Sequence, residues 1–584
     1  MPTNADVARL LHELAMLTEL EDGTRQSFRA RAYHNGVRAV EACPHDVTAL
    51  NQAELTALPG IGRAIAAKIA EFADTGTIAR LEELRDRYPP GYLELIRVPG
   101  IGPKTVALLH EHLGIRSIDD LRAAVAAGRL RDVPGLGVKT EENIAANIAK
   151  LGLTGKERRT TIADALPVAT EVTALLRRVD DVDEVAYAGS LRRFRETVAD
   201  VDVVVAAVDP TPVMDTFTRM AMVREVAARG DKKATVVTAR GLQLDLRVVR
   251  REEFGAALQY FTGSQAHNVR VRERAVRRGW SLNEYGLWET DTGRLLAAQT
   301  EEDIYAALDL QWVPPGMRED VGEVAAAAAD ELPRVASVAD LRGDLHVHTD
   351  LSGDGRNTLD EMVDAALSRG LRYLAITDHG EDLRISGVSA DDMLAQRERI
   401  AALNRRHAGR IRVLHGCELN IGADGDLDYD EEFLASFDWT VASVHSHFRR
   451  DRAAQTNRVL TAIHHPAVRC IGHLQGRRIG RRPGIDLDVD TILDAAAATD
   501  TAIEINSHLD RLDASAEVLR AARGGNVTFV VNSDAHRIRE FDNLQFGVRL
   551  AERGWVPADR IANTWPTDRF LDWVVASRRR GAAR

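Results

Sequence analysis

Two aspartates separated by one residue, Asp200 and Asp202, open the apolar run VVVAAV. Alternate side chains of a strand point to the same face, so this spacing predicts two carboxylates that converge on one point. Carboxylates that lie so close need a cation between them, and their hard oxygen ligands favour Mg²⁺ or Mn²⁺. In LQLDLRVV, Asp245 stands between two leucines, which predicts a third carboxylate on the polar face of another strand.

A Gly-Ser pair and an arginine-rich segment, GSLRRFRET, come shortly before the aspartate pair. Together with three carboxylates, these are the parts of a two-metal nucleotidyl transferase. In such a site one ion activates a primer hydroxyl, and the other holds a triphosphate. The D-x-D pair alone would be weak evidence, because it often marks the end of a surface strand. The combination therefore carries the prediction.

The C-terminal half contains a second set of side chains suited to metal binding, most of them after short apolar runs. These runs are DLHVH, YLAITDH, RVLHGCELN, WTVASVHS, CIGH, AIEINSH and FVVNSDAH. Helical patterns separate them, and such a repeat predicts a parallel barrel with its site at the carboxyl ends of the strands. His346 and His348 are two residues apart, so both imidazoles leave one face of a strand. Imidazoles and carboxylates together suit Zn²⁺, Mn²⁺ or Fe²⁺.

Three similar segments lie near the N-terminus: LPGIGRAIAAKIAEF, VPGIGPKTVALLHEH and VPGLGVKTEENIAANI. In each, two glycines form a tight turn at the start of an amphipathic helix, where free N–H groups can meet a phosphate. This is the helix-hairpin-helix arrangement, which holds the DNA backbone without reading sequence. One copy could be an ordinary turn between helices, but three in succession argue against that. The predicted DNA contacts are Gly60, Gly62, Gly100, Gly102, Gly135 and Gly137.

The elements that position these groups belong to a folded protein of several domains. The chain has 584 residues, of which 45 % are hydrophobic and 28 % charged, and three to five domains are expected at roughly 100–200 residues each. No run of eighteen apolar residues occurs, and the N-terminus carries acids where a secretion signal would be basic. Its three cysteines, Cys43, Cys417 and Cys470, indicate neither a disulfide framework nor a thiolate zinc site. We therefore expect a cytoplasmic protein with no membrane contact.

The net charge is −12. If this charge were spread evenly over the surface, it would repel nucleic acid. Between Arg219 and Arg278, however, fourteen Lys and Arg residues stand against six Asp and Glu residues. Such a segment can be a solvated helix face or a groove for phosphates. An acidic protein can therefore still carry a local surface for DNA.

The string GSLRRFRETVADVDVVV resembles, along its whole length, the nucleotidyl-transferase motif of family X DNA polymerases. The segments FGAALQYFTGSQAHNVRVRERA and SLNEYGLW look like the thumb of the same family. Read alone, their aromatic residues would be core residues. One departure is Ala199, where the family has glycine, and we expect little effect because it precedes the first metal ligand. The resemblance implies metal binding by Asp200, Asp202 and Asp245, triphosphate contacts from Ser190 and Arg193 in the nucleotide-binding turn at Gly189, a sugar pocket at Tyr260, Phe261 and Gly263, and contacts of Asn268 and Arg272 with the nascent base pair.

Residues 24–76, which include RARAYHNGVRAV, look like the small N-terminal domain of that family. There a lysine in the G-x-x-x-A-x-K-I pattern can attack the aldehyde of an abasic sugar. Lys68 stands at this place, and Tyr33 stands at the position of a helper tyrosine. A lysine acts as such a nucleophile only when its amine is partly neutral. The alternative, that Lys68 is a plain phosphate contact, stays open.

From about Asp340 to Ser577 the chain resembles the polymerase and histidinol phosphatase (PHP) domain, beginning at its D-x-H-x-H motif. The resemblance implies up to three metal ions and a 3′–5′ exonuclease favoured by Mn²⁺, with cleavage at abasic sites as a further activity. The loop DLSGDG is one residue longer than the usual form, which makes Asp354 the least secure ligand. The implied ligands are His346, His348, Asp354, His379, Glu418, His445, His473, Asp534 and His536. The remaining histidines His407, His415, His447, His464, His465 and His508 match no ligand of the motif.

The segment GHLQGRRIGRRPG after His473 is a basic loop suited to holding a DNA strand or a phosphate. It departs from the H-P-T-G-R of the family at Leu474 and Gln475, which puts the substrate preference in doubt. Its arginines are Arg477, Arg478, Arg481 and Arg482.

The expected fold is multidomain α/β: an all-α helix-hairpin-helix region, an α+β palm and thumb, and a (β/α)7-type barrel. The resemblance implies a monomeric, nucleoid-associated repair polymerase that uses deoxynucleoside triphosphates on gapped or nicked DNA and processes 3′ ends in its barrel. Two alternatives stay open, a barrel that is a small-molecule phosphatase and a polymerase half that only tethers DNA. The expected domains are 1–85 (N-terminal helix-hairpin-helix), 86–152 (fingers with two repeats), 153–230 (palm), 231–313 (thumb), 314–339 (linker) and 340–577 (PHP barrel).

Overall fold

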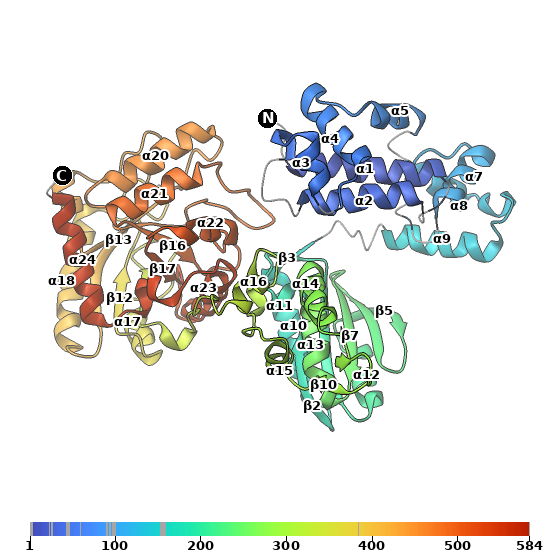
Figure 1. The fold of residues 1–584 in the computed structure, drawn as a ribbon. Helices are drawn as coiled ribbons and strands as arrows, with labels where there is room; N and C mark the ends of the chain where they lie inside the picture. Colours follow the sequence, from blue (N-terminus) through green and yellow to red (C-terminus); the bar gives the residue numbers. More distant parts are fainter. Residues whose placement is uncertain are drawn as a thin grey trace. The chain divides into compact units, whose positions relative to one another are not determined.

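The chain divides into two compact units, residues 1–158 and 159–584, in the computed structural model. The structure describes residues 4–22, 24, 27–41, 47–58, 60–88, 92, 95, 98, 101–151, 159–383 and 385–582. The helices and strands are labelled in Figure 1.

The first unit is all-helical in its described residues, as expected for helix-hairpin-helix repeats. Its helices pack around one core that includes Leu11, Leu14 and Ile69. Gly36 lies directly against Ile65, because a Cβ there would be 3.0 Å from the Ile65 side chain. The helices are α1 (Asn4–Asp22), α2 (Phe28–Glu41), α3 (Gln52–Ala57), α4 (Arg63–Thr75), α5 (Ala79–Arg87), α7 (Pro103–Leu113), α8 (Ile118–Ala126) and α9 (Val138–Leu151).

The second unit begins with a five-stranded mixed sheet in the order β2-β4-β7-β6-β5, which forms the palm. The sheet extends past residue 230, the expected end of the palm, because β6 and β7 pair with the earlier strands. Strands β4 and β7 are parallel neighbours, while the other pairs are antiparallel. Helices α10 (Ile162–Leu176) and α12 (Pro210–Thr218) pack against this sheet, and the short strands β1 (Thr160–Thr161) and β3 (Thr197–Val198) pair beside it. The five strands are β2 (Val182–Tyr187), β4 (Asp200–Ala207), β5 (Val223–Arg229), β6 (Lys233–Thr238) and β7 (Gln243–Val249).

The thumb elements follow, and they enclose a core of their own. Helices α13 (Phe254–Thr262), α14 (Gln265–Val276) and α15 (Glu301–Ala307) accompany the antiparallel sheet β10-β9-β8. The strands are β8 (Trp280–Asn283), β9 (Gly286–Glu289) and β10 (Leu295–Ala297).

Residues 314–339, the expected linker, contain a short Ala-rich helix, α16 (Glu323–Ala328). The segment packs against the elements on either side of it. Arg318 is fully buried and forms an ion pair with Glu301 of α15, whereas the Gly316 N–H donates to Glu552 of the barrel at 2.8 Å. The segment therefore joins thumb and barrel by specific contacts.

Seven parallel strands in the order β11 to β17 form the C-terminal barrel, and the helices between them cover its outside (Figure 1). The bridge between Val347 and Ala535 joins the first and last strands, and Leu345 N–H donates to Asn532, 187 residues away. The expected nearly closed (β/α)7 barrel is thereby confirmed. The strands are β11 (Gly343–Val347), β12 (Tyr373–Ile376), β13 (Arg412–Asn420), β14 (Trp439–Ser443), β15 (Cys470–Ile471), β16 (Ala502–Asn506) and β17 (Phe529–Asn532).

The barrel helices are amphipathic and bury their apolar faces against the strands. α23, for example, packs Leu544, Val548 and Leu550 into the core. The helices are α17 (Leu359–Ser368), α18 (Ala390–Arg406), α19 (Glu431–Ala435), α20 (Arg452–His464), α21 (Val489–Thr499), α22 (Ala516–Ala521), α23 (Leu544–Arg553) and α24 (Thr567–Ala582). Among the described residues, every helix is too short or too polar to span a bilayer.

Candidate active sites

The palm brings together the three predicted carboxylates. Asp200 and Asp202 lie on β4, and Asp245 is the direct partner of Asp202 on the parallel strand β7. Burial, together with the charges of Asp200 and Asp245, raises the pKa of Asp202 to about 7. Asp245 is held by Thr235 Oγ1 at 2.5 Å and by Gln243 Nε2 at 2.7 Å. Carboxylates packed this closely repel one another, which is the condition that a bound divalent cation relieves.

The Gly-Ser turn is the one-turn helix α11 (Gly189–Arg192), and it lies directly against this cluster. Gly189 has a φ of +64°, and a Cβ there would stand 2.3 Å from Asp202 Oδ2. Glycine is therefore required at this position on two grounds, backbone conformation and space. Nearby, Arg193 donates from Nε to Glu319 at 3.1 Å and from NH1 to the Thr262 carbonyl at 2.5 Å.

The predicted sugar-pocket and base-pair residues lie side by side on the thumb. The rings of Tyr260 and Phe261 meet edge to face at 5.1 Å, and the Arg272 guanidinium lies 5.3 Å from the Tyr260 ring centre. Asn268 donates to the Tyr260 carbonyl at 2.8 Å and accepts from Gln259 at 2.9 Å. Gly263 ends α13 with a φ of +67°. The four side chains thus form one cluster, while their contacts with a nucleotide stay a prediction.

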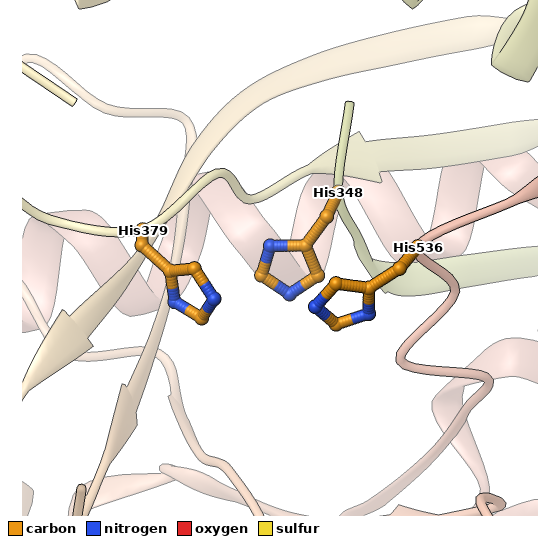
Figure 2. Close-up of side chains that lie close together, drawn as sticks. All are labelled: His348, His379 and His536. Carbon is orange, nitrogen blue, oxygen red and sulfur yellow. The ribbon is translucent and has the colours of Figure 1, made fainter. Parts of the chain in front are cut away.

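Three imidazoles from three different strand ends converge at the mouth of the barrel (Figure 2). Those of His348, His379 and His536 offer nitrogens that lie within 4.8 Å of one another. Two further groups of the same compactness surround them: His346 with His348 and Asp534, and His379 with Glu418 and His445.

The other two predicted ligands join the same cluster. His473 Nε2 is 2.9 Å from Glu418 Oε1. Asp354 Oδ2 lies 3.3 Å from His379 Nε2 and 3.6 Å from His536 Nε2, so the longer loop still delivers its carboxylate. The structure therefore brings together all nine side chains that the sequence predicted as ligands. Three overlapping donor groups fit the expectation of more than one ion.

The electrostatics of this cluster fit a metal centre. The buried Glu418 has its pKa held well below the ordinary value, since neighbouring imidazoles outweigh the effect of burial. Burial, together with the neighbouring His536 and His379, lowers the pKa of His348 to about 4. Both ring nitrogens of this fully buried His348 lack a hydrogen-bond partner within the described part of the chain. Buried neutral imidazoles without partners are costly unless they bind a cation.

Sequence reasoning missed Glu504, which orients two of the ligands. This buried carboxylate accepts from His346 Nδ1 at 2.7 Å and from the His473 N–H at 2.6 Å. Such a partner fixes the ring and its tautomer so that the other nitrogen faces the metal. The only signal in the sequence is an acid inside the apolar strand AIEIN, which burial would not tolerate without a partner.

A cleft of about 410 Å³ opens over the imidazoles, and its walls carry cations that suit a phosphate. Arg478 and Arg511 line it, and so does His508, which matched no ligand of the motif. Burial and the neighbouring Arg511 lower the pKa of Arg478. Of the other predicted arginines, Arg477 pairs instead with Glu196 of the palm at 2.8 Å, and Arg482 lies over the Phe448 ring.

The N-terminal hairpins have the expected backbone where they are described. Gly60 and Gly135 adopt φ values of +95° and +87°, and Gly62 and Gly102 are the N-caps of α4 and α7. Gly137 directly precedes α9. Gly100 lies outside the described residues. Lys68 is half-buried on α4, and Tyr33 is half-buried on α2.

The fold and its two sites define a chain in which a nucleotidyl-transferase core is joined to a metal-dependent phosphoesterase barrel. Family models match in the same order: a helix-hairpin-helix domain at 2–78, a tandem helix-hairpin-helix at 92–150, the DNA polymerase beta thumb at 257–319 and the PHP domain at 344–508. The "DNA polymerase/3′-5′ exonuclease PolX" of Bacillus subtilis is 34 % identical over 96 % of this chain and 97 % of its own. The chain belongs to the family of that bacterial enzyme.

Two other relatives each resemble one half. "DNA polymerase lambda" of Rattus norvegicus is 26 % identical over 53 % of this chain and 56 % of its own. A "Probable phosphatase" of Caldicellulosiruptor saccharolyticus is 28 % identical over 40 % of this chain and 96 % of its own.

Proposed function

We propose that the chain is a DNA repair polymerase that fills short gaps and trims 3′ ends in its PHP domain. The observation that carries this function is the presence of two separate sites in one chain, a carboxylate cluster in the palm and an imidazole cluster in the barrel. The match to a polymerase with 3′-5′ exonuclease along nearly its full length supports the same division.

In the palm, Asp200, Asp202 and Asp245 hold Mg²⁺ or Mn²⁺. When bound, these ions activate the primer hydroxyl and stabilise the leaving pyrophosphate. Ser190 and Arg193 hold the triphosphate in the turn that Gly189 allows. Tyr260 and Phe261 lie against the sugar with Gly263, where a close backbone leaves no space for a ribose 2′-hydroxyl. Asn268 and Arg272 contact the nascent pair.

In the barrel, the nine clustered side chains hold up to three ions of Mn²⁺, Zn²⁺ or Fe²⁺. When bound, the ions activate water for in-line attack on phosphorus and stabilise the departing 3′ oxygen. Glu504 keeps His346 in the orientation that binds metal. Arg478 and Arg511 neutralise the phosphate in the cleft. The same hydrolysis of a phosphodiester would cleave a DNA strand beside an abasic site.

The glycine turns of the hairpins hold gapped or nicked DNA by its backbone, and the incoming substrates are deoxynucleoside triphosphates. Because these contacts read phosphates and not bases, binding depends on salt more than on sequence. We expect a monomer that acts on the nucleoid in the cytoplasm.

The test uses one gapped duplex with a 5′-labelled primer and a downstream 5′-phosphate, incubated with Mn²⁺ or Mg²⁺, with and without deoxynucleotides. Extension with nucleotides and shortening without them are expected. A chain that binds gapped DNA but neither extends nor shortens the primer would favour the alternative in which the polymerase half only tethers DNA.

A second candidate for the barrel is a small-molecule phosphatase, because the probable phosphatase matches this chain over 242 residues, about the length of the barrel. Rates on histidinol phosphate and on a DNA 3′ end distinguish the two. Because the barrel is attached to a half that holds DNA, a DNA 3′ end is the favoured substrate. If the primer extends but never shortens, while the phosphate ester is hydrolysed, the phosphatase is the correct assignment.

A further inference from the structure

Two arginines of the barrel helix α23 make hydrogen bonds to the nucleotide-binding turn of the palm. Arg549 donates to the Arg192 carbonyl at 2.5 Å and to the Tyr187 hydroxyl at 2.9 Å. One helical turn later, Arg553 donates to the Arg193 carbonyl at 3.0 Å. Residues separated by some 360 positions are therefore joined by direct contacts at a turn predicted to hold the triphosphate.

These contacts satisfy groups that the turn cannot satisfy by itself. The last carbonyls of any helix lack intrahelical partners, and α11 has only four residues. Arginines commonly complete helix carboxyl ends in this way. The next residue, Phe194, has a left-handed φ of +59° and is buried between α11 and the barrel, where its ring stacks on Phe546 at 6.2 Å.

The same contacts set the charge beside Arg193. Its guanidinium bonds to Glu319, and Arg553 bonds to the same carboxylate oxygen at 2.8 Å. Both arginines are largely buried, Arg553 being only 3 % exposed. Because Glu319 shares its charge between them, Arg193 keeps positive charge for a ligand. Arg195 also lies 3.6 Å from the other oxygen of Glu319, but Arg193 and Arg553 share one oxygen, so without Arg553 this carboxylate would cancel more of the charge of Arg193.

We propose that Arg553 of the PHP domain is a positioning residue of the polymerase site, which acts through Glu319 and the backbone of Arg193 to present Arg193 to the triphosphate of the incoming nucleotide. This proposal rests on the proposed role of Arg193 in the palm. It makes the barrel a structural part of the nucleotide site, apart from its own hydrolysis.

The test is Arg553→Met in the full chain, which removes the donors and keeps the length of the side chain. The KM for the deoxynucleotide in gap filling should rise about tenfold, with a smaller change in kcat. The reason is that Arg193, no longer positioned by Arg553, loses its charge-assisted hydrogen bond to the triphosphate. The 3′–5′ trimming rate should not change. Arg553→Lys, which keeps a charge but cannot bridge both acceptors as well, should lie between wild type and Arg553→Met.

Arg520→Met is the matched control, because Arg520 donates to the Arg553 carbonyl and pairs with Glu517. It should leave the KM unchanged. In an Arg193→Met background, Arg553→Met should add less than twofold, since its effect passes through Arg193. A KM within twofold of wild type for Arg553→Met, or a full tenfold effect without Arg193, would overturn the proposal.

Loss of both activities in Arg553→Met would mean that the residue supports the fold in general, which also contradicts a positioning role. A wild-type chain that fails to extend the primer would refute the proposed polymerase function, and that outcome is separate from the comparison of variants.

Discussion

Glu418 is the residue on which the barrel site depends most. Its carboxylate lies within 3.5 Å of nitrogens from five histidines, with the shortest distance, 2.8 Å, to His379 Nδ1. We expect Glu418→Gln to lower the metal bound per chain and to reduce 3′–5′ trimming about 100-fold or more, because an amide cannot bridge cations. Metal content by plasma mass spectrometry and trimming of a labelled primer check this. The exposed His464→Ala is the control, and a full metal content in Glu418→Gln would contradict the assignment.

Asp200 tests the separation of the two sites. Asp200→Ala removes one carboxylate from the palm and none from the barrel, so synthesis should fall about 1,000-fold or more while trimming stays at the wild-type rate. Both rates are read from one labelled primer, with and without deoxynucleotides. An equal fall in trimming would mean that one site serves both reactions.

At the scale of elements, the thumb is joined to residues 314–339 by a buried ion pair with a definite dependence on pH. Burial raises the pKa of Glu301, but Arg318 and Arg192 outweigh it, so the pKa is lowered to about 2. The folded state therefore favours the charged form. This contribution to stability is complete above pH of about 4.5 and disappears as the pH falls toward 2.

We expect the backbone amides of α15 to exchange hydrogen faster as the pH is lowered across that range, after correction for intrinsic exchange rates. Arg318→Met, which leaves the buried Glu301 paired with Arg192 alone, should reproduce part of the effect at neutral pH. Unchanged protection of α15 in both experiments would show that the ion pair does not hold the segment.

The role of Lys68, on helix α4 of the first hairpin, can be tested separately. If Lys68 is the nucleophile of an abasic-sugar lyase, borohydride should trap the wild-type chain on DNA with an incised abasic site, and Lys68→Ala should reduce the trapped product about 100-fold. If Lys68 only contacts phosphate, neither chain is trapped and the variant binds DNA more weakly, with a smaller salt dependence. Tyr33→Phe should reduce trapping only in the first case.

The order of the domains and the nine clustered side chains were predictable from the resemblance to known families, because the matching motifs are short segments at strand ends. The partners of those motifs were not predictable. Glu504 belongs to a strand whose other residues are apolar, and its role appears only when β16 lies beside β11's histidines in space. Glu319 and Arg553 are 234 residues apart. A linker was expected at residues 314–339, whereas the burial of Arg318 depends on its ion pair with Glu301 of α15.

At the scale of the molecule, the two compact units predict separable functions. A chain of residues 159–584 contains the palm, thumb and barrel sites, but it lacks the three glycine turns. We expect it to trim single-stranded 3′ ends at the wild-type rate and to bind gapped duplex at least about tenfold more weakly, with a shallower salt dependence. Fluorescence anisotropy at several salt concentrations measures this. Wild-type affinity for the gap would show that the hairpins contribute no binding.

The bridge from Val347 to Ala535 has a consequence for biosynthesis. Strand β17 and the loop that carries His536 are synthesised after the other strands of the barrel, and they close a sheet that β11 opens. An interrupted chain that ends before this point already contains the palm carboxylates, but it has neither a closed barrel nor the imidazole of His536. Such interrupted products therefore lack a complete hydrolytic site, which forms only after β17 and the loop of His536 have been synthesised.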